Sequence, residues 1–327
     1  MAIATRPLLE IKDLCVDYQS DRGPTRAVDG VSLEVRKGEF LGIVGESGCG
    51  KSTLLYSIAR LLTPPAEIAS GDIWFEGHDI VSMTESELRH FRWKQFSVVM
   101  QSAMNALNPV MTIGEQLRDA FEAHERLTGR QITARSAELM RIVGIDPVHL
   151  GSYPHQLSGG MRQRAMIAMA LAFTPDLVIM DEPTSALDVV AQRSLMQKIK
   201  QLQREFGFAT IFVTHDMSLV SHFSDRLAVM YAGQIVEVGD TRQIFAEPKH
   251  PYTVGLMRSF PSISGELQPL SGIPGSPPDL ARPPAGCRFH PRCPHVMPRC
   301  KTEDPEFYVR EGDLVRCFLF APGARQE

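Results

Sequence analysis

A glycine-rich segment early in the chain has the residue types and spacing of a phosphate-binding loop. Gly45-Glu-Ser-Gly-Cys-Gly50-Lys51-Ser52 fits the pattern G-x-x-x-x-G-K-[ST]. The glycines let the backbone wrap so that its N–H groups face phosphate oxygens, while the lysine adds a cation and the serine hydroxyl can ligate Mg²⁺. We predict that nucleotide phosphates bind at Gly45, Ser47, Gly48, Cys49, Gly50, Lys51, Ser52 and Thr53. Cys49 is expected to be a small filler in this loop and not a nucleophile.

Two adjacent carboxylates follow the apolar run Leu177 to Met180. A strand that delivers Asp181 to the phosphate pocket would make this carboxylate an Mg²⁺ partner, directly or through water. Glu182 then stands where a carboxylate can orient or deprotonate a water that attacks the terminal phosphate. A surface-exposed acidic pair is the alternative, because Asp-Glu pairs are common and only the preceding strand sets these two apart.

Three further polar sites stand at the ends of predicted elements. Gln101 and His215 each follow a short apolar run. Ser158-Gly159-Gly160 opens a helix, with the serine as N-cap and the glycines leaving N–H groups uncovered, which makes a second anion-binding device. Each site also has a plainer interpretation: a polar strand end, a hydrogen-bonded histidine and an ordinary helix start.

Short apolar runs alternate with helical patterns along much of the chain. We expect strands over 9–16, 31–35, 40–44, 96–100, 177–180 and 209–214, and helices over 51–62, 113–126, 134–143 and 161–173. This alternation predicts a mostly parallel sheet covered by helices, with its ligand site at the carboxyl ends of the strands, where the polar residues above stand. We also expect a helical subdomain over about 102–165 and a hairpin over 227–238.

The composition is that of an ordinary globular protein. The 327 residues carry a formal net charge of −4, with 43 % hydrophobic and 22 % charged residues, which allows one large domain and a smaller appendage. The most apolar run, 165–173, is far too short to cross a membrane, and the first residues lack a basic segment followed by an apolar one. We therefore expect neither a membrane-spanning nor a signal-bearing protein. The mildly acidic balance also disfavours a sequence-independent nucleic-acid binder.

Taken together, these motifs resemble those of the ATP-binding subunits of ABC transporters. The resemblance covers Leu8 to about Gly239 and includes Ser185-Ala-Leu-Asp188 after the acidic pair. It implies an α/β P-loop NTPase fold, RecA-like with a mostly parallel sheet, an antiparallel β subdomain and the inserted helical subdomain, to which a small Cys-rich C-terminal extension is added. It also implies a head-to-tail dimer in which each ATP lies between the phosphate loop of one subunit and the Ser-Gly-Gly signature of the other.

The same resemblance implies a role for each motif residue. Tyr18 would stack on adenine, with a surface strand aromatic as the alternative. Gln101 would touch Mg²⁺ and the attacking water, Glu182 would be the catalytic base, and His215 would contact the γ-phosphate. The Mg²⁺ ligands would be Ser52, Gln101 and Asp181. The partner subunit's ATP would be capped by Ser158, Gly159 and Gly160. The expected reaction is in-line attack of water on ATP, with catalysis by positioning and charge neutralisation.

Beyond Gly239 the chain resembles the dipeptide/oligopeptide and nickel importer subfamily. This resemblance rests on His250-Pro-Tyr-Thr253, the segments 273–280 and 286–293, and Ala106-Leu-Asn-Pro109. It implies a transport-coupled ATPase, peripheral on the cytoplasmic face of the cell membrane. Its partners would be a second identical or homologous ATPase subunit, two transmembrane permease subunits and an extracytoplasmic peptide-binding protein, without nucleic acid. Peptide is the commonest cargo of the group, while nickel, glutathione and other small solutes stay open.

Two other classes of function match the sequence less well. Soluble ABC ATPases that act on nucleic acid or the ribosome usually carry two cassettes or a long coiled coil, whereas this chain has one cassette and no heptads. A regulatory metal-binding module with vestigial hydrolysis would need damaged motifs, yet Lys51, Asp181, Glu182 and His215 are intact.

Four of the six cysteines lie in a Pro-rich extension, predicted over 261–327 after an ATPase domain over 1–260. The spacing Cys287-x₅-Cys293-x₆-Cys300-x₁₆-Cys317 lacks the paired knuckles of common zinc sites and the common ferredoxin spacings. It therefore leaves Zn²⁺, an iron–sulfur cluster and free thiols open, and two nearby histidines, 290 and 295, could compete as ligands. The family resemblance implies a [4Fe–4S] cluster on these four cysteines. We expect it to be structural, since a bound metal can order a segment that buries little apolar surface.

Overall fold

The computed structural model describes residues 6–21, 23–101, 106–185, 187–259 and 272–323. Two prolines of the predicted Pro-rich segment, Pro261 and Pro269, lie outside these ranges. The chain divides into two compact units. The first comprises Met1–Val35, Leu41–Val81 and Thr214–Glu327, and the second comprises Arg36–Phe40 and Ser82–Val213. The boundaries predicted at residues 102, 165 and 260 remain predictions.

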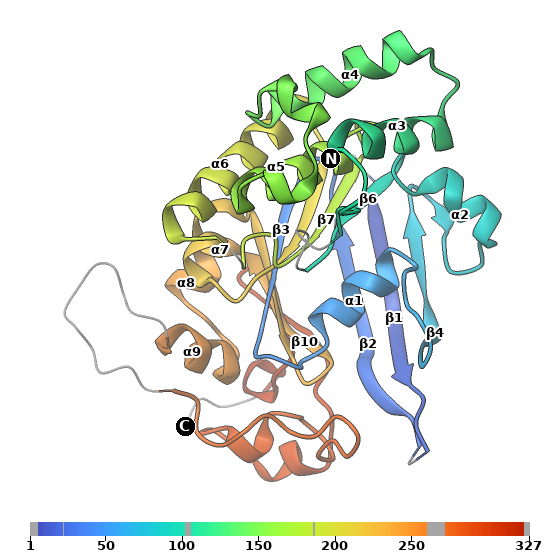
Figure 1. Ribbon diagram of the computed structural model, residues 1–327. Helices are drawn as coiled ribbons and strands as arrows, with labels where there is room; N and C mark the ends of the chain where they lie inside the picture. The colour runs from blue at the N-terminus through green and yellow to red at the C-terminus, as the bar shows by residue number, and fades with distance from the viewer. Residues whose placement is uncertain (1–5, 22, 102–105, 186, 260–271, 324–327) are drawn as a thin grey trace. The chain divides into compact units, whose positions relative to one another are not determined.

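An antiparallel sheet in the first unit contains the first two predicted strands. Its order is β2-β1-β4-β5 (Figure 1), with bounds β1 Leu9–Tyr18, β2 Thr25–Val35, β4 Ala66–Phe75 and β5 His78–Asp79. In β2 the side chains of Val31, Leu33 and Val35 are buried and those between them are exposed, as the alternation predicts. Strand β4 was not among the predicted strands, because Gly71 and a register shift against β1 interrupt its pattern.

A second group of paired strands in the first unit has the order β11-β12-β10-β9-β3. Its strands are β3 Phe40–Val44, β9 Arg226–Tyr231, β10 Gln234–Asp240, β11 Tyr308–Arg310 and β12 Asp313–Val315. Strand β3 is wholly buried and runs parallel to β9, while β9 and β10 form the predicted hairpin. Its turn residues Ala232 and Gly233 both have positive φ, as a tight hairpin turn requires.

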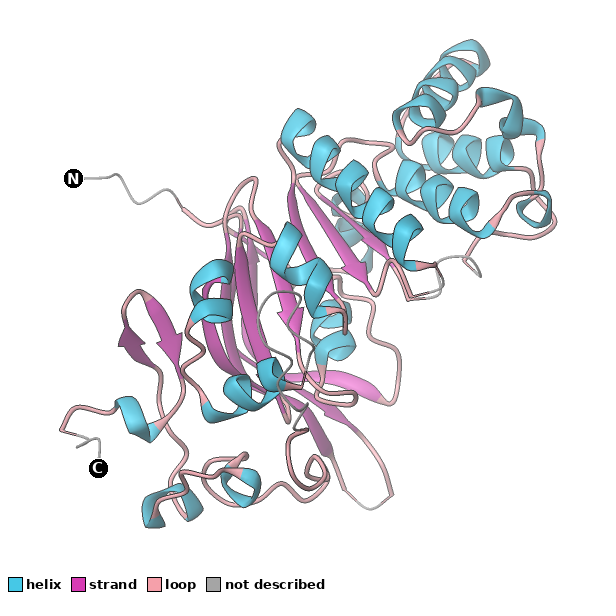
Figure 2. Ribbon diagram, turned by 90° about the vertical axis from the view of Figure 1, so that its left-hand side faces the viewer, coloured by secondary structure: helices cyan, strands magenta, loops and turns pink. Residues whose placement is uncertain are grey.

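Among the residues that the structure describes, the first unit also contains four helices, and most of its C-terminal part is irregular. The helices are α1 Lys51–Ile58, α7 Met217–Phe223, α8 Thr241–Ala246 and α9 Pro251–Arg258. Over residues 272–323 the C-terminal extension adds the 3₁₀ turns η4 His290–Arg292, η5 Pro298–Lys301 and η6 Phe318–Phe320, joined by loops (Figure 2). Helix α1 ends four residues earlier than predicted, at Ile58 and not at residue 62.

In its described residues the second unit contains three parallel strands, each predicted from a short apolar run. Their order is β8-β7-β6, with bounds β6 Phe96–Val99, β7 Leu177–Asp181 and β8 Ala209–Val213. Every residue of β7 and β8 is buried. The strand ends next to Gln101 and Glu182 are therefore at the same edge of this part of the sheet.

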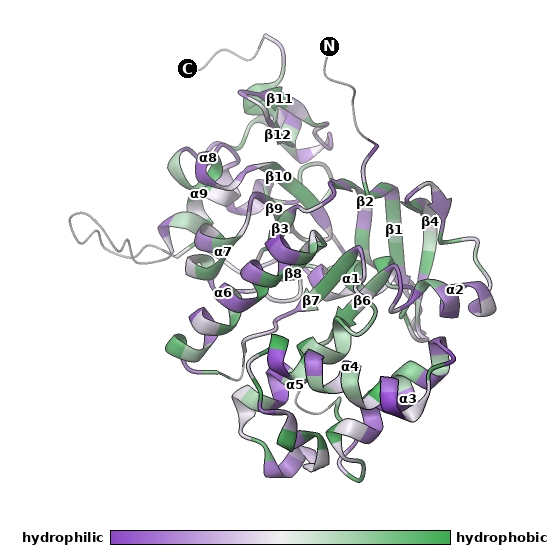
Figure 3. Ribbon diagram, turned by 90° about the horizontal axis from the view of Figure 1, so that it is seen from above, coloured by the Kyte–Doolittle hydropathy of each residue, from purple (hydrophilic) through white to green (hydrophobic). Residues whose placement is uncertain are grey.

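The helices of the second unit begin at side-chain caps. They are α2 Glu85–Phe91, α3 Ile113–His124, α4 Gly129–Ile142, α5 Gly159–Ala170 and α6 Val189–Phe206, with 3₁₀ turns η2 Pro147–Gly151 and η3 Pro154–Gln156. Thr84, Thr112 and Thr128 form capping boxes, and the last of these starts α4 five residues before the predicted start at 134. Helices α3 and α6 carry both hydrophobic and hydrophilic bands (Figure 3). No helix in the described ranges combines the length and apolarity needed to cross a membrane.

Candidate functional site

The glycine-rich loop between β3 and α1 has a backbone path that only glycine permits. A Cβ atom at Gly45 would lie 2.1 Å from the carbonyl oxygen of Met230, and one at Gly50 would lie 2.2 Å from that of Ala27. Gly50 is also the N-cap of α1, with φ of 103°. The sequence places glycine at these positions because the loop packs directly against neighbouring backbone, and helix α1 therefore starts at Lys51 with its N–H groups at the loop.

Polar side chains around this loop converge on it. The Lys51 Nζ donates to the carbonyl oxygens of Gly45 and Glu46, at 2.8 and 2.9 Å. The Tyr18 hydroxyl lies 3.2 Å from Thr53 Oγ1, so the predicted adenine-stacking residue is at the first turn of α1. Burial raises the pKa of Cys49, with Lys51 opposing the shift. A neutral, buried thiol agrees with the expectation that Cys49 is a filler.

The predicted carboxylates lie in the second unit at the end of β7. Asp181 is the last residue of the strand and is completely buried. Glu182 follows with φ of 46°, a left-handed conformation that is uncommon for a residue with a side chain, and its N–H donates to the carbonyl oxygen of Val213 at 2.9 Å. Gln101 Nε2 donates to Glu182 Oε2 at 3.2 Å. The structure thus brings together two residues 81 positions apart, as their placement on neighbouring strand ends predicts.

The Ser-Gly-Gly segment begins a helix as predicted. Ser158 is the N-cap of α5, and its Oγ accepts a hydrogen bond from Met161 N at 3.3 Å. Gly159 and Gly160 form the first turn and are only partly covered. This helix start therefore combines a satisfied cap with glycines that leave backbone N–H groups approachable.

The predicted site residues fall into two sets. Tyr18, the loop 45–53 and His215 belong to the first unit, whereas Gln101, Ser158 to Gly160, Asp181 and Glu182 belong to the second. His215 is exposed and immediately precedes Asp216, the N-cap of α7. The roles that the family resemblance implies for these residues in ATP chemistry remain predictions.

Three residues at the loop were not predicted as site residues. The N–H of Glu46 donates to the Tyr252 hydroxyl at 2.9 Å, and both Glu46 carboxylate oxygens accept from the Arg292 guanidinium, at 2.7 and 3.0 Å. The sequence shows Tyr252 and Arg292 only as parts of family-typical segments. Contacts over 206 and 246 positions leave no local sequence signal, so spacing could not have revealed them.

None of the four cysteines of the extension forms a disulfide bond, and Cys300 and Cys317 are buried. Burial is the main cause that raises the pKa of Cys317 to about 12 and that of Cys287 to about 11, and the neighbouring cysteines contribute to both shifts. Within the residues that the structure describes, no three His, Cys, Asp or Glu side chains are grouped so that they could hold a metal ion. The predicted [4Fe–4S] cluster and its zinc alternative are therefore not confirmed.

Comparison with known families gives two matches along the chain. The model of the family described as ABC transporter matches residues 28–185. The model described as oligopeptide/dipeptide transporter, C-terminal region, matches residues 236–300. Together they include the phosphate loop, the Ser-Gly-Gly segment, the acidic pair and three of the four clustered cysteines.

Known proteins and solved structures resemble the chain over most of its length. The dipeptide transport ATP-binding protein DppD of Caldanaerobacter subterraneus is 41 % identical over 319 residues, covering 97 % of this chain and 98 % of that protein. The oligopeptide transport ATP-binding protein OppD of Bacillus subtilis is 43 % identical over 323 residues, covering 97 % of this chain and 90 % of that protein. The ATP-binding cassette MJ0796, solved as a dimer bound to ADP and Pi, aligns with a TM-score of 0.65 and 28 % identity, covering 72 % of this chain and 99 % of that one.

Proposed function

The chain belongs to the ABC transporter ATP-binding proteins of the oligopeptide/dipeptide type, and we propose that it hydrolyses ATP to power peptide import. The observation that carries this function is the match of nearly the whole chain to peptide-transport ATP-binding proteins at 41–43 % identity. The phosphate loop supports it chemically, because Lys51 and the N-terminus of α1 are built into an anion-binding backbone.

Hydrolysis is proposed to proceed by in-line attack of water on the γ-phosphate. The hydrogen bond from Gln101 orients the Glu182 carboxylate, which accepts the proton of the attacking water. Lys51 and His215 neutralise charge on the transferred phosphoryl group, and the adenine stacks on Tyr18. These assignments rest on the family motifs together with the local geometry of each unit.

Magnesium ion is the expected companion of ATP. The donor set of Ser52, Gln101 and Asp181 offers a hydroxyl, an amide oxygen and a buried carboxylate, which are the oxygen ligands that Mg²⁺ prefers. When bound, the ion supplies charge neutralisation at the β- and γ-phosphates. The residues of the chain therefore suit the ion that the reaction needs.

The partners are proposed to be those of an importer. They are a second identical or homologous ATPase subunit, two transmembrane permeases and an extracytoplasmic peptide-binding protein, with this chain peripheral at the cytoplasmic face of the membrane. The dimer reported for MJ0796 supports a paired ATPase. In such a pair, Ser158, Gly159 and Gly160 would cap the nucleotide of the other subunit, as the start of α5 allows.

We propose in addition that Cys287, Cys293, Cys300 and Cys317 hold a [4Fe–4S] cluster. Support comes from the family resemblance, from the burial of Cys300 and Cys317, and from the hydrogen bond that the Cys287 N–H donates to the carbonyl oxygen of Cys300 at 2.9 Å. A cluster is larger than a single ion, so its thiolates stand farther apart than four ligands of one Zn²⁺. Iron and acid-labile sulfide analysis of anaerobically purified protein tests this, and stoichiometric zinc without iron would refute it.

Transport by the reconstituted complex tests the main proposal. Proteoliposomes that contain this chain, its permeases and the binding protein should show ATP hydrolysis stimulated by di- or oligopeptides. The same measurement with nickel and glutathione distinguishes peptide import from import of these alternative solutes by a transporter of the same architecture. Stimulation by neither peptide nor either of these solutes would contradict the import function.

A further inference from the structure

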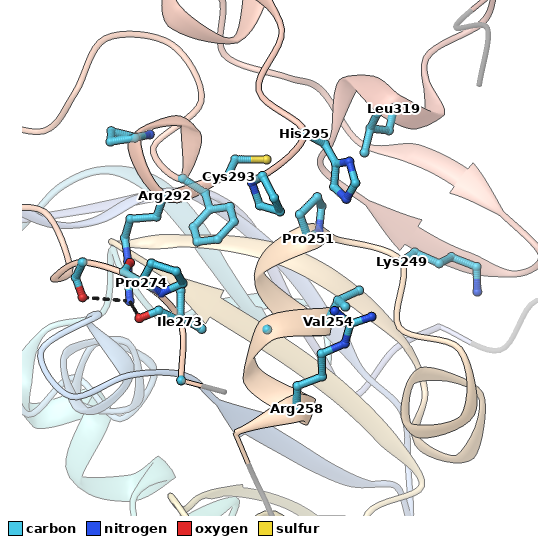
Figure 4. A pocket seen from close by; sticks show the side chains of 16 residues that line it. Lys249, Pro251, Val254, Arg258, Ile273, Pro274, Arg292, Cys293, His295 and Leu319 are labelled. Carbon is cyan, nitrogen blue, oxygen red and sulfur yellow. Dashed lines mark hydrogen bonds between the residues drawn. The ribbon is translucent and has the colours of Figure 1, made fainter. Parts of the chain in front are cut away.

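Arg292 joins the C-terminal extension to the phosphate loop. Its guanidinium forms a two-point ion pair with Glu46, the second residue of the loop, at 2.7 and 3.0 Å. It also donates to the carbonyl oxygen of Pro274 at 2.8 Å and to that of Ile273 at 3.3 Å (Figure 4). Only 5 % of the Arg292 side chain and 25 % of the Glu46 side chain are exposed, so water screens this pair weakly.

Two further contacts fix the same stretch of loop. The Tyr252 hydroxyl of α9 accepts from the Glu46 N–H, and Tyr252 packs against Tyr231 and Phe289 with ring centroids 4.5 and 5.5 Å apart. The carbonyl oxygen of Cys49 accepts from the N–H of Gly233, at 2.9 Å. The loop backbone is thus held at both Glu46 and Cys49.

The extension also contacts the hairpin turn that holds Cys49. Arg288 donates to the carbonyl oxygen of Ala232 and to the Asp29 carboxylate, the latter at 2.6 Å. Arg288 and Arg292 lie five and one residues before Cys293, in the segment around η4. One short part of the extension therefore supports the phosphate loop directly, through Glu46, and indirectly, through the turn at 232–233.

The charge of Glu46 makes this contact relevant to nucleotide binding. A carboxylate within an anion-binding loop repels the phosphates that the loop receives. Arg292 neutralises that carboxylate and turns it toward the extension. Without Arg292, Glu46 would keep its negative charge and lose its anchor.

We propose that Arg292 is a positioning residue for ATP, through which the C-terminal extension neutralises Glu46 and holds the phosphate loop ready for nucleotide. This inference rests on the proposed ATP hydrolysis and adds a function for the extension at the same site. It assigns Tyr252 a supporting role, because its hydroxyl fixes the Glu46 backbone.

Binding of a fluorescent ATP analogue to the full-length chain tests the proposal. Arg292→Met should weaken affinity about tenfold, as a coupling of ordinary size between two parts of a protein would. Glu46→Gln added to Arg292→Met should recover part of that loss, because it removes the uncompensated charge. In the assembled transporter, Arg292→Met should raise KM for ATP more than it lowers kcat.

Arg316→Met is the matched control. Like Arg292, Arg316 immediately precedes a cysteine, Cys317. Its guanidinium pairs with the Asp304 carboxylate at 2.7 Å and donates to the carbonyl oxygen of Pro305 at 2.9 Å. Both partners belong to the extension itself, so this arginine does not contact the phosphate loop through them. The affinity of this control variant for the ATP analogue should stay within twofold of wild type. Unchanged affinity of Arg292→Met, an equal loss in Arg316→Met, or no recovery on adding Glu46→Gln would each overturn the proposal. If the wild-type chain bound no nucleotide at all, the proposed function itself would fail.

Discussion

At the scale of single residues, the candidate site combines an unusual backbone with ordinary side chains. Glu182 holds a left-handed φ of 46°, and the loop glycines hold paths that a Cβ atom would block. Such conformations persist only where the surrounding structure determines them, and they concentrate at functional sites. The backbone conformation therefore fixes the positions of Glu182 and of the phosphate loop without a ligand.

Glu182→Gln should separate ATP binding from turnover. The amide keeps the size and most hydrogen bonds of the side chain but cannot accept the proton of the attacking water. We expect nucleotide affinity close to wild type and a hydrolysis rate lower by roughly 100- to 10,000-fold in the assembled transporter, measured by phosphate release. Glu205→Gln, an exposed change of the same kind on α6, is the control. Wild-type turnover of Glu182→Gln would remove this residue from catalysis.

Gly45→Ala should damage the phosphate loop itself. The added Cβ would meet the carbonyl oxygen of Met230 at 2.1 Å, so the loop must shift. A displacement of about 1 Å is enough to lower kcat/KM for ATP roughly 100-fold. Gly151→Ala adds the same atom where nothing lies within 4 Å and should leave kcat/KM unchanged. Equal activity of the two variants would show that the loop tolerates the shift.

At the scale of elements, the helices start where side chains satisfy their first N–H groups. Thr84, Thr112 and Thr128 do so in capping boxes, and His250 caps α9 by accepting from the N–H of Tyr252 at 3.0 Å. The sequence predicted the start of α3 correctly. It missed the start of α4, because Gly129 and Arg130 carry no apolar periodicity and only the cap identifies that turn.

The cap of α9 should make stability depend on pH. Burial lowers the pKa of His250 to about 3, whereas an unfolded histidine has its ordinary pKa of 6.5. Between these values the unfolded chain binds a proton that the folded chain does not, so acid favours unfolding. The free energy of unfolding should fall by about 2 kcal/mol from pH 7 to pH 5 through this residue.

His250→Asn tests this pH dependence. Asparagine can also cap a helix but does not titrate, so the variant should lose less stability than wild type between pH 7 and pH 5. Urea unfolding at both pH values, followed by circular dichroism, gives the comparison. Identical pH dependence in the two proteins would show that His250 is not its source.

At the scale of the whole molecule, a buried ion pair fastens the extension to the rest of the first unit. Lys249 Nζ lies 2.7 Å from Asp313 Oδ2, and these side chains are 4 % and 1 % exposed. Gly239 makes room for the carboxylate, because a Cβ there would lie 1.8 Å from Asp313 Oδ1. The pair links the segment before α9 to strand β12.

Removing one charge of this pair should destabilise the fold strongly. Asp313→Ala leaves the buried Lys249 ammonium with the exposed Glu311 carboxylate at 3.7 Å in place of its buried partner, and losing a partner of a buried pair costs about 3–5 kcal/mol. Glu303→Ala breaks the exposed pair with Arg299 in the same extension and should cost less than about 1 kcal/mol. Urea unfolding midpoints of the two variants distinguish a structural fastening from a surface contact.

The sequence predicts the strands and the phosphate loop of the cassette better than it predicts the contacts of the extension, and the reason is physical. Local apolar runs predict the strands β3, β6, β7 and β8, and local glycines predict the phosphate loop. The contacts of Arg292, Arg288 and Asp313 join residues 64 to 259 positions apart. No periodicity encodes such contacts, so only the folded chain reveals them.

The pairing of β12 with β10 has a consequence for solubility. Val238 and Glu237 of β10 face Leu314 and Val315 of β12, and the Arg316 N–H donates to the carbonyl oxygen of Val236. A chain cut before the extension would present this row of backbone donors and acceptors to solvent, on a strand rich in branched apolar residues. Open edges of that kind recruit strands from other molecules. By covering this edge, the extension also protects the chain from self-aggregation, and this protection does not depend on any metal or nucleotide.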